Sequence, residues 1–582
     1  MSSTRSPYSA PLDGWIRALS RPDAGSLGPQ LTRFYGAGEV RTWAARYVEA
    51  LGAYAGAYGR DSEVVVARCP GQMNLMGMHI DYGGMPSLRL AVQGADTLTV
   101  AGGPAGRERG TRVRLQSVLH VPGETARFDP VEFDLAALLP AENVGTRQAL
   151  MDYAGRVCAE REARTGSVFD RTWGIMPQGQ LVFLESYFRG RTPIRGFDAL
   201  VWSNVSPSGG ISSSSALVIS TAFAALGLHG LRPYVDIPEE DLVDGIGTSE
   251  WIRGTRGGTA DHGGMILGRS GKLVSVGVFP AGNRGSAAVP DQYVALILDS
   301  GVPRVYDDAI KEETVIAYPL GTFLVRDLLL PTLARTGGWE ALRPDFAECL
   351  RFIRDITADN LGLGVHHLCQ LLRQVPVRTC LRQLEERARE AGAGEAWAAM
   401  HRRDVGQKFP NIGPEYPILL RRRFAFGLAE QDRVRAAVEY LQAGDMPTVF
   451  ELARLSHAGD RDQEVADEDL DALEERARSG DPRGQLCFLP GGYGRMTPGY
   501  DRAAGMVNAF LQERGGPAAG AVQRLGAGWG GNIGGLVLAD FVSGRWRADF
   551  EAFLRDEVGI RPDLDRGVAV PGEGACLLEP GS

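Results

Sequence analysis

The sequence predicts a mixed α/β (α+β) fold with more than one domain, and three observations support this. A strand-like run at 197–203 leads into a Gly/Ser loop, and the apolar residues that follow predict a helix ending near Leu228. The run 293–298, Tyr-Val-Ala-Leu-Ile-Leu, is typical of a buried strand. Long amphipathic patterns between 318 and 478 predict a mainly helical region.

The remaining elements are predicted from shorter patterns. An alanine-rich segment at 40–58 predicts a helix, and 63–68 predicts a strand that ends in a Gly-rich turn. Alternation at 111–115 predicts another strand, followed by acidic, alanine-rich helical sequence. Glycines and a proline punctuate the polar stretch 280–290, so we expect a domain boundary there.

Composition restricts the class of function. The chain has 582 residues, 44% of them hydrophobic, which is enough for two to four domains with substantial cores. A net charge of −9 argues against a general surface for nucleic acid or anionic membranes and favours small-molecule chemistry. We find no uninterrupted apolar run near the roughly 18 residues of a membrane span, and no signal-peptide core, so we expect a cytoplasmic protein.

Cysteine and lysine usage excludes some chemistries. The seven cysteines are odd in number and scattered without a Cys-x-x-Cys pair, so we expect reduced, structural thiols. The chain has three lysines and no Gly-x-x-x-x-Gly-Lys-Ser/Thr motif, so phosphate chemistry must use another loop.

The loop after the 197–203 strand has the composition of a phosphate-binding site. Glycines allow close backbone approach, serines supply small hydroxyls, and the first turn of the following helix offers free N–H donors. A flexible Ser/Gly loop is the alternative, but a strand before it and a helix after it favour an anion site. The candidate binding residues are Pro207, Gly209, Gly210, Ser212, Ser213, Ser214 and Ser215.

A second polar motif lies at 70–84, among small residues. If the local backbone is extended, His79 and Asp81 point to one side and can hydrogen-bond neighbouring hydroxyls. The alternative is that Asp81 caps a turn and His79 is half buried.

Two carboxylates follow, eleven residues apart. Glu250, on a predicted helix, can reach a divalent cation that a serine hydroxyl also touches, as Mg²⁺ sites often use one or two protein oxygens plus phosphate. Asp261, in a predicted tight Gly-rich turn, can accept a proton from a substrate hydroxyl. Simple turn chemistry is the alternative for the Asp261-His262 pair.

A third motif, 526–531, formally satisfies Gly-x-Gly-x-x-Gly. A dinucleotide-binding fingerprint needs a helix after the glycines, whereas 536–540 predicts a strand. We therefore disfavour a Rossmann site.

Taken together, these motifs resemble those of the GHMP kinases, and of galactokinases in particular. The segment 70–84 is similar to the galactokinase signature Gly-Arg-Val-Asn-Leu-Ile-Gly-Glu-His-Thr-Asp-Tyr-x-x-Gly. The segment 207–216 matches the second family motif, with a register uncertain by one serine, and 526–531 matches the third. The segment 493–501 also resembles the one that precedes the third motif in galactokinases. All motifs occur in the same order along the chain as in the family.

The resemblance implies a two-lobed fold, with a ribosomal-S5-like N-terminal lobe and a ferredoxin-like C-terminal lobe that carries helical insertions. We place the lobes at 1–285 and 286–582, with the insertion at about 318–480. It also implies transfer of the ATP γ-phosphate to the anomeric hydroxyl of a galactose-like sugar, with Mg²⁺ as cofactor. A small sugar is then the expected partner, and monomer and homodimer both stay open.

The same resemblance assigns roles to residues. Asp261 takes the position of the catalytic aspartate, and Gln72 takes the position of a nearby arginine. We add Arg256 as our own candidate for a catalytic cation. Ser214 or Ser215 and Glu250 would hold Mg²⁺. The residues at sugar-binding positions are Met78, His79, Asp81 and Gly258.

Two departures from the family pattern matter most. Gln72 stands where galactokinases carry an arginine, so we expect the pKa of Asp261 to rise unless another cation, Arg256 or else Arg68, compensates. Met78 replaces a glutamate that in the family binds the C6 hydroxyl, which predicts a pentose, a 6-deoxy sugar or a C6-modified sugar. A catalytically impaired sugar- and ATP-binding regulator is one alternative, and a kinase for a non-sugar alcohol is another.

Overall fold

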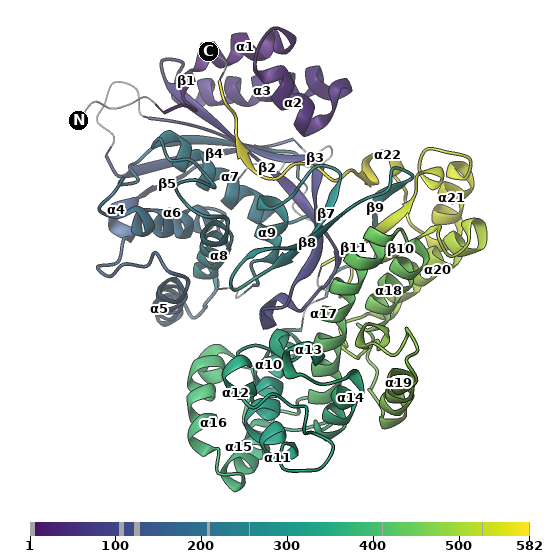
Figure 1. The fold of residues 1–582 in the computed structure, drawn as a ribbon. Helices are drawn as coiled ribbons and strands as arrows, with labels where there is room; N and C mark the ends of the chain where they lie inside the picture. The colour runs from purple at the N-terminus through teal and green to yellow at the C-terminus, as the bar shows by residue number, and fades with distance from the viewer. Residues whose placement is uncertain are drawn as a thin grey trace. The chain divides into compact units, whose positions relative to one another are not determined.

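The computed structural model describes residues 6–103, 110–120, 128–205, 210–254, 257–305, 307–409, 411–526 and 528–580. The chain packs as two compact units (Figure 1). The first unit combines Met1–Asn74, Arg89–Val289 and Ala569–Ser582, and the second combines Leu75–Leu88 and Pro290–Val568. The predicted division at 285/286 stays a prediction about domains. Two segments pack with the unit that is remote from them in sequence: Leu75–Leu88 with the second unit and Ala569–Ser582 with the first.

A nine-stranded mixed sheet organises the first unit. Its main path runs β1-β2-β3-β6-β4-β5, with β13 beside β2, β7 beside β3 and β8 beside β7. The pairing of β4 with β6 is parallel, while β3 with β6 and β7 with β8 are antiparallel. The strands are β1 Ala10–Pro11, β2 Glu63–Met76, β3 Ser87–Gly102, β4 Arg112–Leu119, β5 Val131–Asp134, β6 Asp198–Ser203, β7 Lys272–Gly277, β8 Gly282–Ala288 and β13 Cys576–Leu577.

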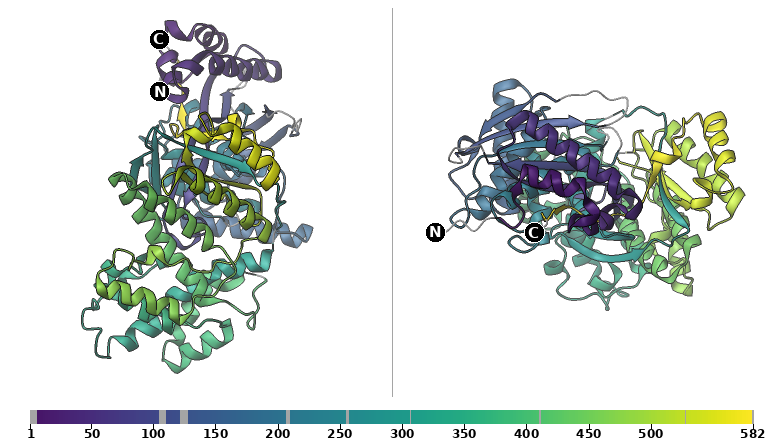
Figure 2. Two further views of the ribbon diagram at one scale, coloured as in Figure 1. Left: turned by 90° about the vertical axis from the view of Figure 1, so that its right-hand side faces the viewer. Right: turned by 90° about the horizontal axis from the view of Figure 1, so that it is seen from above.

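Helices cover both faces of this sheet. Leu98 and Val100 on β3 pack into the aromatic core of the N-terminal helices α1 to α3. The intervening Thr99 points to the opposite face, as strand alternation requires, and its hydroxyl donates to Ser220 Oγ on α7 at 2.9 Å. Figures 1 and 2 show α1, α2 and α3 together on one side of the strands. The helices are α1 Leu12–Ser20, α2 Leu27–Tyr35, α3 Val40–Tyr58, α4 Leu135–Leu138, α5 Arg147–Thr165, α6 Ile175–Phe188, α7 Ser213–Leu228, α8 Glu239–Ser249 and α9 Ala260–Ile266.

The second unit contains a four-stranded sheet of order β10-β11-β9-β12. Strand β11 is antiparallel to both β10 and β9, and helices α20 and α21 share a hydrophobic core with the sheet. These elements are β9 Tyr293–Asp299, β10 Gly520–Arg524, β11 Asn532–Leu538, β12 Val568–Ala569, α20 Pro498–Gly515, α21 Arg547–Phe553 and α22 Leu564–Gly567.

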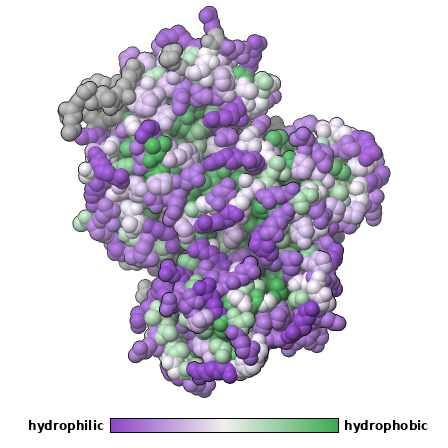
Figure 3. All heavy atoms as spheres, in the orientation of Figure 1, coloured by the Kyte–Doolittle hydropathy of each residue, from purple (hydrophilic) through white to green (hydrophobic). Residues whose placement is uncertain are grey.

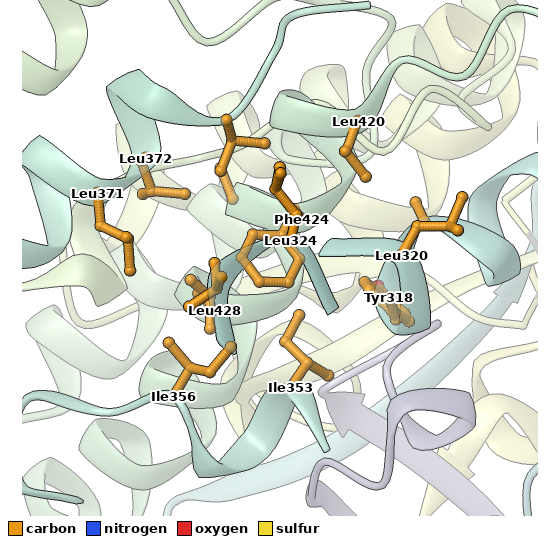
Figure 4. Close-up of a cluster of buried hydrophobic side chains, with 14 of the residues drawn as sticks. Tyr318, Leu320, Leu324, Ile353, Ile356, Leu371, Leu372, Leu420, Phe424 and Leu428 are labelled. Carbon is orange, nitrogen blue, oxygen red and sulfur yellow. The ribbon is translucent and has the colours of Figure 1, made fainter. Parts of the chain in front are cut away.

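The predicted helical region is confirmed, and it begins earlier than expected, at Asp308. Its core gathers side chains from helices distant in sequence, among them Leu324, Leu371 and Phe424 (Figure 4). The helices are α10 Asp308–Phe323, α11 Leu330–Leu333, α12 Phe346–Cys349, α13 Ala358–Leu361, α14 Val365–Gln374, α15 Leu381–Glu390, α16 Gly394–Met400, α17 Leu420–Ala443, α18 Met446–Ala458 and α19 Asp467–Ser479.

One continuous helical stretch, Asp308–Leu333, is long and apolar enough to cross a membrane by length and composition alone. Charged residues such as Arg326 and Asp327 interrupt it, and 72% of its most apolar window is buried inside the structure. Core helices of globular proteins pass the same test, so the stretch is weak evidence for a span, and the cytoplasmic location stays a prediction. On the face drawn in Figure 3, hydrophilic residues predominate and apolar residues lie in small groups.

Several local predictions can now be compared with the structure. The helix predicted at 40–58 is confirmed as α3, and the strand predicted at 293–298 is confirmed within β9. The strand predicted at 63–68 continues to Met76, so the first part of the Gly-rich segment, predicted as a turn, is strand. The polar stretch 282–288 forms β8, because its backbone pairs with β7 despite its glycines.

Candidate functional site

The Gly/Ser loop leads into the N-terminus of α7, as predicted. Gly210 and Ser212 both have positive φ, at 69° and 61°, which turns the chain into the helix. The Ala216 N–H donates to the Ser212 carbonyl, so the first-turn N–H groups of residues 213–215 precede the helical ladder. Such groups bind anions at helix N-termini. Pro207 and Gly209 lie outside the described residues, so their predicted roles stay predictions.

Four side chains of the first unit form a closed hydrogen-bonded ring beside this helix. Ser212 Oγ donates to Asp261 Oδ2 at 2.5 Å. Gln72 Nε2 donates to Ser212 Oγ at 3.1 Å. Arg89 Nη1 closes the ring by donating to Gln72 Oε1 at 2.8 Å and to Asp261 Oδ1 at 2.5 Å. The hydroxyl proton of Ser212 is therefore engaged by the carboxylate, although the prediction gave this serine to the phosphates.

The sheet and the loop bring these residues together. Gln72 and Arg89 lie on β2 and β3, which are neighbours in the sheet. The Gln72 N–H donates to the Ile211 carbonyl at 3.1 Å, and a Cβ on Gly71 would lie 3.2 Å from that oxygen. A Cβ on Gly264 would lie 3.1 Å from Arg89 Cδ. Small residues at both positions therefore let the ring close.

Asp261 lies in the first turn of α9, so the prediction of a tight Gly-rich turn around it is wrong. Burial raises the pKa of Asp261, but the Arg89 charge and the Ser212 hydrogen bond outweigh it and hold the pKa below its ordinary value. The side chain is still 40% exposed, so solvent moderates these effects. The pKa of Asp261 was expected to rise unless another cation compensated, and such a cation is present.

That cation is Arg89, which was not among the predicted site residues. Of the two arginines predicted to compensate, Arg256 lies outside the described residues. Arg68 is fully buried elsewhere, with Nη2 at 2.9 Å from Asp96 Oδ1 and Nη1 bonded to the Glu573 carbonyl at 2.8 Å. The signal for Arg89 was an arginine within the apolar run 88–92, because a buried guanidinium needs a carboxylate partner.

The predicted metal ligands have donor atoms of the right kind. Glu250 begins a 3-10 helix, Glu250–Arg253, directly after α8, and its Oε1 lies 2.9 Å from His262 Nε2. Ser214 and Ser215 lie in the first turn of α7. Carboxylate and hydroxyl oxygens suit Mg²⁺, which takes few protein ligands when phosphates supply the rest. The described part of the chain contains no cluster of three or more His, Cys, Asp or Glu side chains that could hold a metal, so the Mg²⁺ site stays a prediction. Gly258 is half-buried just before α9.

In the second unit, His79 is fixed by packing. Its φ is 67°, its ring stacks on Tyr493 with centroids 4.6 Å apart, and its Nε2 lies 3.5 Å from Asp460 Oδ1. Burial lowers the pKa of His79 to about 4, against the effect of Asp460, so the ring is neutral at physiological pH. A 3-10 helix, Asp81–Gly83, follows. The backbone here is not extended, so the condition under which His79 and Asp81 would point to one side is not met.

Other segments singled out by sequence converge around His79. Asp460 forms an ion pair with Arg524 at 3.1 Å, and both are fully buried. Arg495 lies over the rings of Tyr493 and Trp529, 5.0 Å from each centroid. The third motif and the segment upstream of it therefore support the first motif from within the same unit.

The helical region also holds the turn of the first motif. The Gly77 N–H donates to Glu430 Oε1 at 2.8 Å, on α17. The Tyr318 hydroxyl, on α10, donates to the His79 carbonyl at 3.0 Å. Met78 and Asp81 are both buried in this turn. At least part of the predicted insertion thus has an internal role, because it positions the predicted sugar-binding segment.

Comparisons with known proteins match the segments that contain the ring residues. The family model for the galactokinase galactose-binding signature matches residues 52–102, and the model for the GHMP kinases N terminal domain matches residues 180–269. A galactokinase from Candida parapsilosis is 24% identical over 232 residues, which are 40% of this chain and 39% of that protein. One from Candida maltosa is 23% identical over 233 residues, which are 40% of this chain and 91% of that protein.

A solved structure shares the fold. The Lactococcus lactis galactokinase complexed with galactose matches with a TM-score of 0.55 and 17% identity, over 92% of this chain and 100% of that one. The match supports the predicted α/β fold of this kinase class. The chain is therefore similar to galactokinases in its galactose-binding signature and to the GHMP kinases in the segment 180–269, and it shares the fold of a solved galactokinase.

Proposed function

We propose that this protein is an ATP-dependent sugar kinase that phosphorylates the anomeric C1 hydroxyl of a galactose-like monosaccharide. The observation that carries the proposal is the ring around Asp261. It fixes both carboxylate oxygens of the proposed base, Oδ1 by Arg89 and Oδ2 by Ser212. Each carboxylate oxygen can accept a further hydrogen bond, so Asp261 can also accept one from a substrate hydroxyl.

In the proposed reaction the O1–H proton of the sugar passes to Asp261 while O1 forms a bond to the γ-phosphorus. The bond from the γ-phosphorus to the bridging oxygen breaks, and ADP leaves. A carboxylate with a lowered pKa is ionised at neutral pH but is a weak base. Asp261 therefore orients the hydroxyl first and takes the proton late, which suits a loose phosphoryl-transfer transition state.

ATP and Mg²⁺ are the proposed co-substrate and cofactor. The N-terminus of α7 would bind phosphate oxygens, and Glu250 with Ser214 or Ser215 would hold the metal ion. When bound, Mg²⁺ neutralises phosphate charge in reactions of this kind.

The proposed sugar lacks an ordinary C6 hydroxyl: a pentose, a 6-deoxy sugar or a C6-modified sugar. Met78 supports this, since a buried thioether prefers apolar contact and accepts hydrogen bonds weakly. His79, Asp81 and Gly258 are the other proposed sugar-binding residues.

An ATP-consumption assay with Mg²⁺ over D-galactose, L-arabinose, L-fucose and mevalonate tests the proposal. We expect turnover, with a higher kcat/KM for L-arabinose or L-fucose than for D-galactose. Asp261→Asn should lower kcat by about 10²- to 10⁴-fold while ATP binding persists. A preference for D-galactose would refute the C6 argument. Turnover of mevalonate alone would indicate a non-sugar alcohol kinase, and ATP binding without turnover of any sugar would indicate a regulator.

A further inference from the structure

We infer that Arg89 is the positioning cation of the phosphotransfer site and that Gln72 is its matched partner, so that the charge absent at position 72 is supplied from the neighbouring strand. This inference rests on the proposed function. Arg89 is called a positioning residue because it acts through the carboxylate of Asp261.

The geometry of Arg89 leaves little freedom. One atom, Nη1, bonds both Gln72 Oε1 at 2.8 Å and Asp261 Oδ1 at 2.5 Å, and the Arg89 side chain is only 4% exposed. A buried guanidinium is held by packing as well as by hydrogen bonds, so it keeps its place without reorganising during reaction. Gly264 contributes by leaving room for the Arg89 stem.

The chemistry of residue 72 explains why a glutamine stands there. An amide accepts and donates at once, and Gln72 accepts from Arg89 through Oε1 while it donates to Ser212 through Nε2. An arginine at position 72 can only donate, and it would place a second cation against Arg89. Gln72 and Arg89 are therefore a compensated pair, and neither substitution is neutral without the other.

The charged groups around Asp261 are consistent with this assignment. His262 is its chain neighbour and is bonded to Glu250 of the 3-10 helix, and Asp244 on α8 accepts from the Thr259 hydroxyl at 3.1 Å. Helix α7 carries no charged side chain, and Lys272 lies at the exposed start of β7. Among these described elements, Arg89 is the arginine that contacts the carboxylate.

Steady-state kinetics on the full chain provide the first test. Arg89→Ala should lower kcat by about 10²- to 10³-fold with the KM for ATP changed only a few-fold, and Arg89→Lys should recover part of the loss. Gln72→Arg should impair turnover alone, and adding Arg89→Leu to it should restore activity. Arg114→Ala is the matched control, because Arg114 pairs with Asp198 through two 2.6 Å bonds elsewhere in the first unit. Its kcat should equal that of wild type.

A second measurement does not depend on turnover. NMR titration of ¹³C-labelled aspartate carboxyls, with Asp261→Asn to assign the signal, gives the pKa of Asp261 directly. Arg89→Ala should raise that pKa and Arg114→Ala should not. If the wild type turns over no sugar, the proposed function fails while this titration still decides the role of Arg89. A kcat within threefold of wild type for Arg89→Ala, or an unchanged pKa of Asp261, would overturn the inference.

Discussion

Replacing Glu430 by glutamine should destabilise the second unit more than its single lost charge suggests. Glu430 and Arg433 are both fully buried on α17 and are joined by a 2.6 Å bond from Arg433 Nε to Glu430 Oε2. The other oxygen, Oε1, accepts from the Ser456 hydroxyl at 2.6 Å and from the Gly77 N–H at 2.8 Å. An amide has one oxygen, so the variant turns an N–H₂ group either toward Arg433 or toward two other donors.

The magnitude follows from burial. Removing one partner of a buried ion pair leaves the other charge uncompensated and costs about 3–5 kcal/mol. Glu439→Gln is a matched control on the same helix, because Glu439 pairs with Arg435 at 2.8 Å while the two side chains are 60% and 54% exposed. Exposed pairs of this kind contribute only about 0–1 kcal/mol. The two variants should therefore differ by about 3 kcal/mol in the free energy of unfolding of this unit.

Urea unfolding followed by circular dichroism measures this difference, and hydrogen exchange at the Gly77 amide localises it. Exchange at Gly77 should accelerate in Glu430→Gln, because its acceptor is weakened, and should not change in Glu439→Gln. Equal unfolding free energies for the two variants, within 1 kcal/mol, would refute the reasoning.

The pH dependence of stability independently tests whether the ionised Glu430 carboxylate stabilises the folded state. Burial raises the pKa of Glu430, but the charges of Arg433 and Arg524 outweigh it, so its pKa in the folded state is lowered. A depressed folded-state pKa adds stability above the ordinary glutamate value of about 4.3, and that stability is lost as the pH falls through the folded-state value. The wild type should therefore lose its advantage over Glu430→Gln on acidification below about pH 4. An advantage that grew in acid would contradict this assignment.

Three further predictions concern the hydrogen-bonded ring around Asp261 and the turn that contains Met78. Ser212→Ala removes the hydrogen bond to Asp261 Oδ2, so it should raise the pKa of Asp261 and lower kcat by about tenfold, as the acid limb of the pH–rate profile would show; an unmoved acid limb would count against this role. Gly264→Ala should shift Arg89 and lower kcat several-fold. The melting temperature should change little, because alanine favours the helix over glycine by about 1 kcal/mol. An unchanged kcat would mean that Arg89 can move without loss of activity. Met78→Glu should raise the ratio of D-galactose to L-arabinose turnover, and a constant ratio would remove Met78 from the specificity argument.

Local pattern was sufficient for much of the fold. The helices at 40–58 and 213–228 follow from apolar and small residues that agree with their surroundings. The second half of β2, residues 69–76, could not be predicted, because Pro70 and Gly71 are turn residues in sequence and strand residues only in this sheet. The polar strand β8 was missed for the same reason, since pairing with β7 determines it.

Sequence motifs identified candidate residues but not the contacts between them. Ser212 and Asp261 were both candidates, Ser212 for phosphate binding and Asp261 as the base, and the structure brings their side chains to 2.5 Å. Arg89 was not, because its carboxylate partner lies 172 residues away and no local pattern connects them. The strained conformation of His79 was equally invisible, since Tyr493 and Asp460, which hold the ring, are remote in sequence.

The contacts of Arg89 change the interpretation of Gln72. From sequence it was the main support for a regulator without activity, because an amide cannot replace a guanidinium. In the structure the same amide links a buried arginine to the serine that holds Asp261. A cation placed against a potential base serves phosphotransfer, a step that a protein that only binds sugar and ATP does not perform. A compensated loss of the arginine therefore argues for retained phosphotransfer, and it leaves Met78 as the departure that bears on which sugar is used.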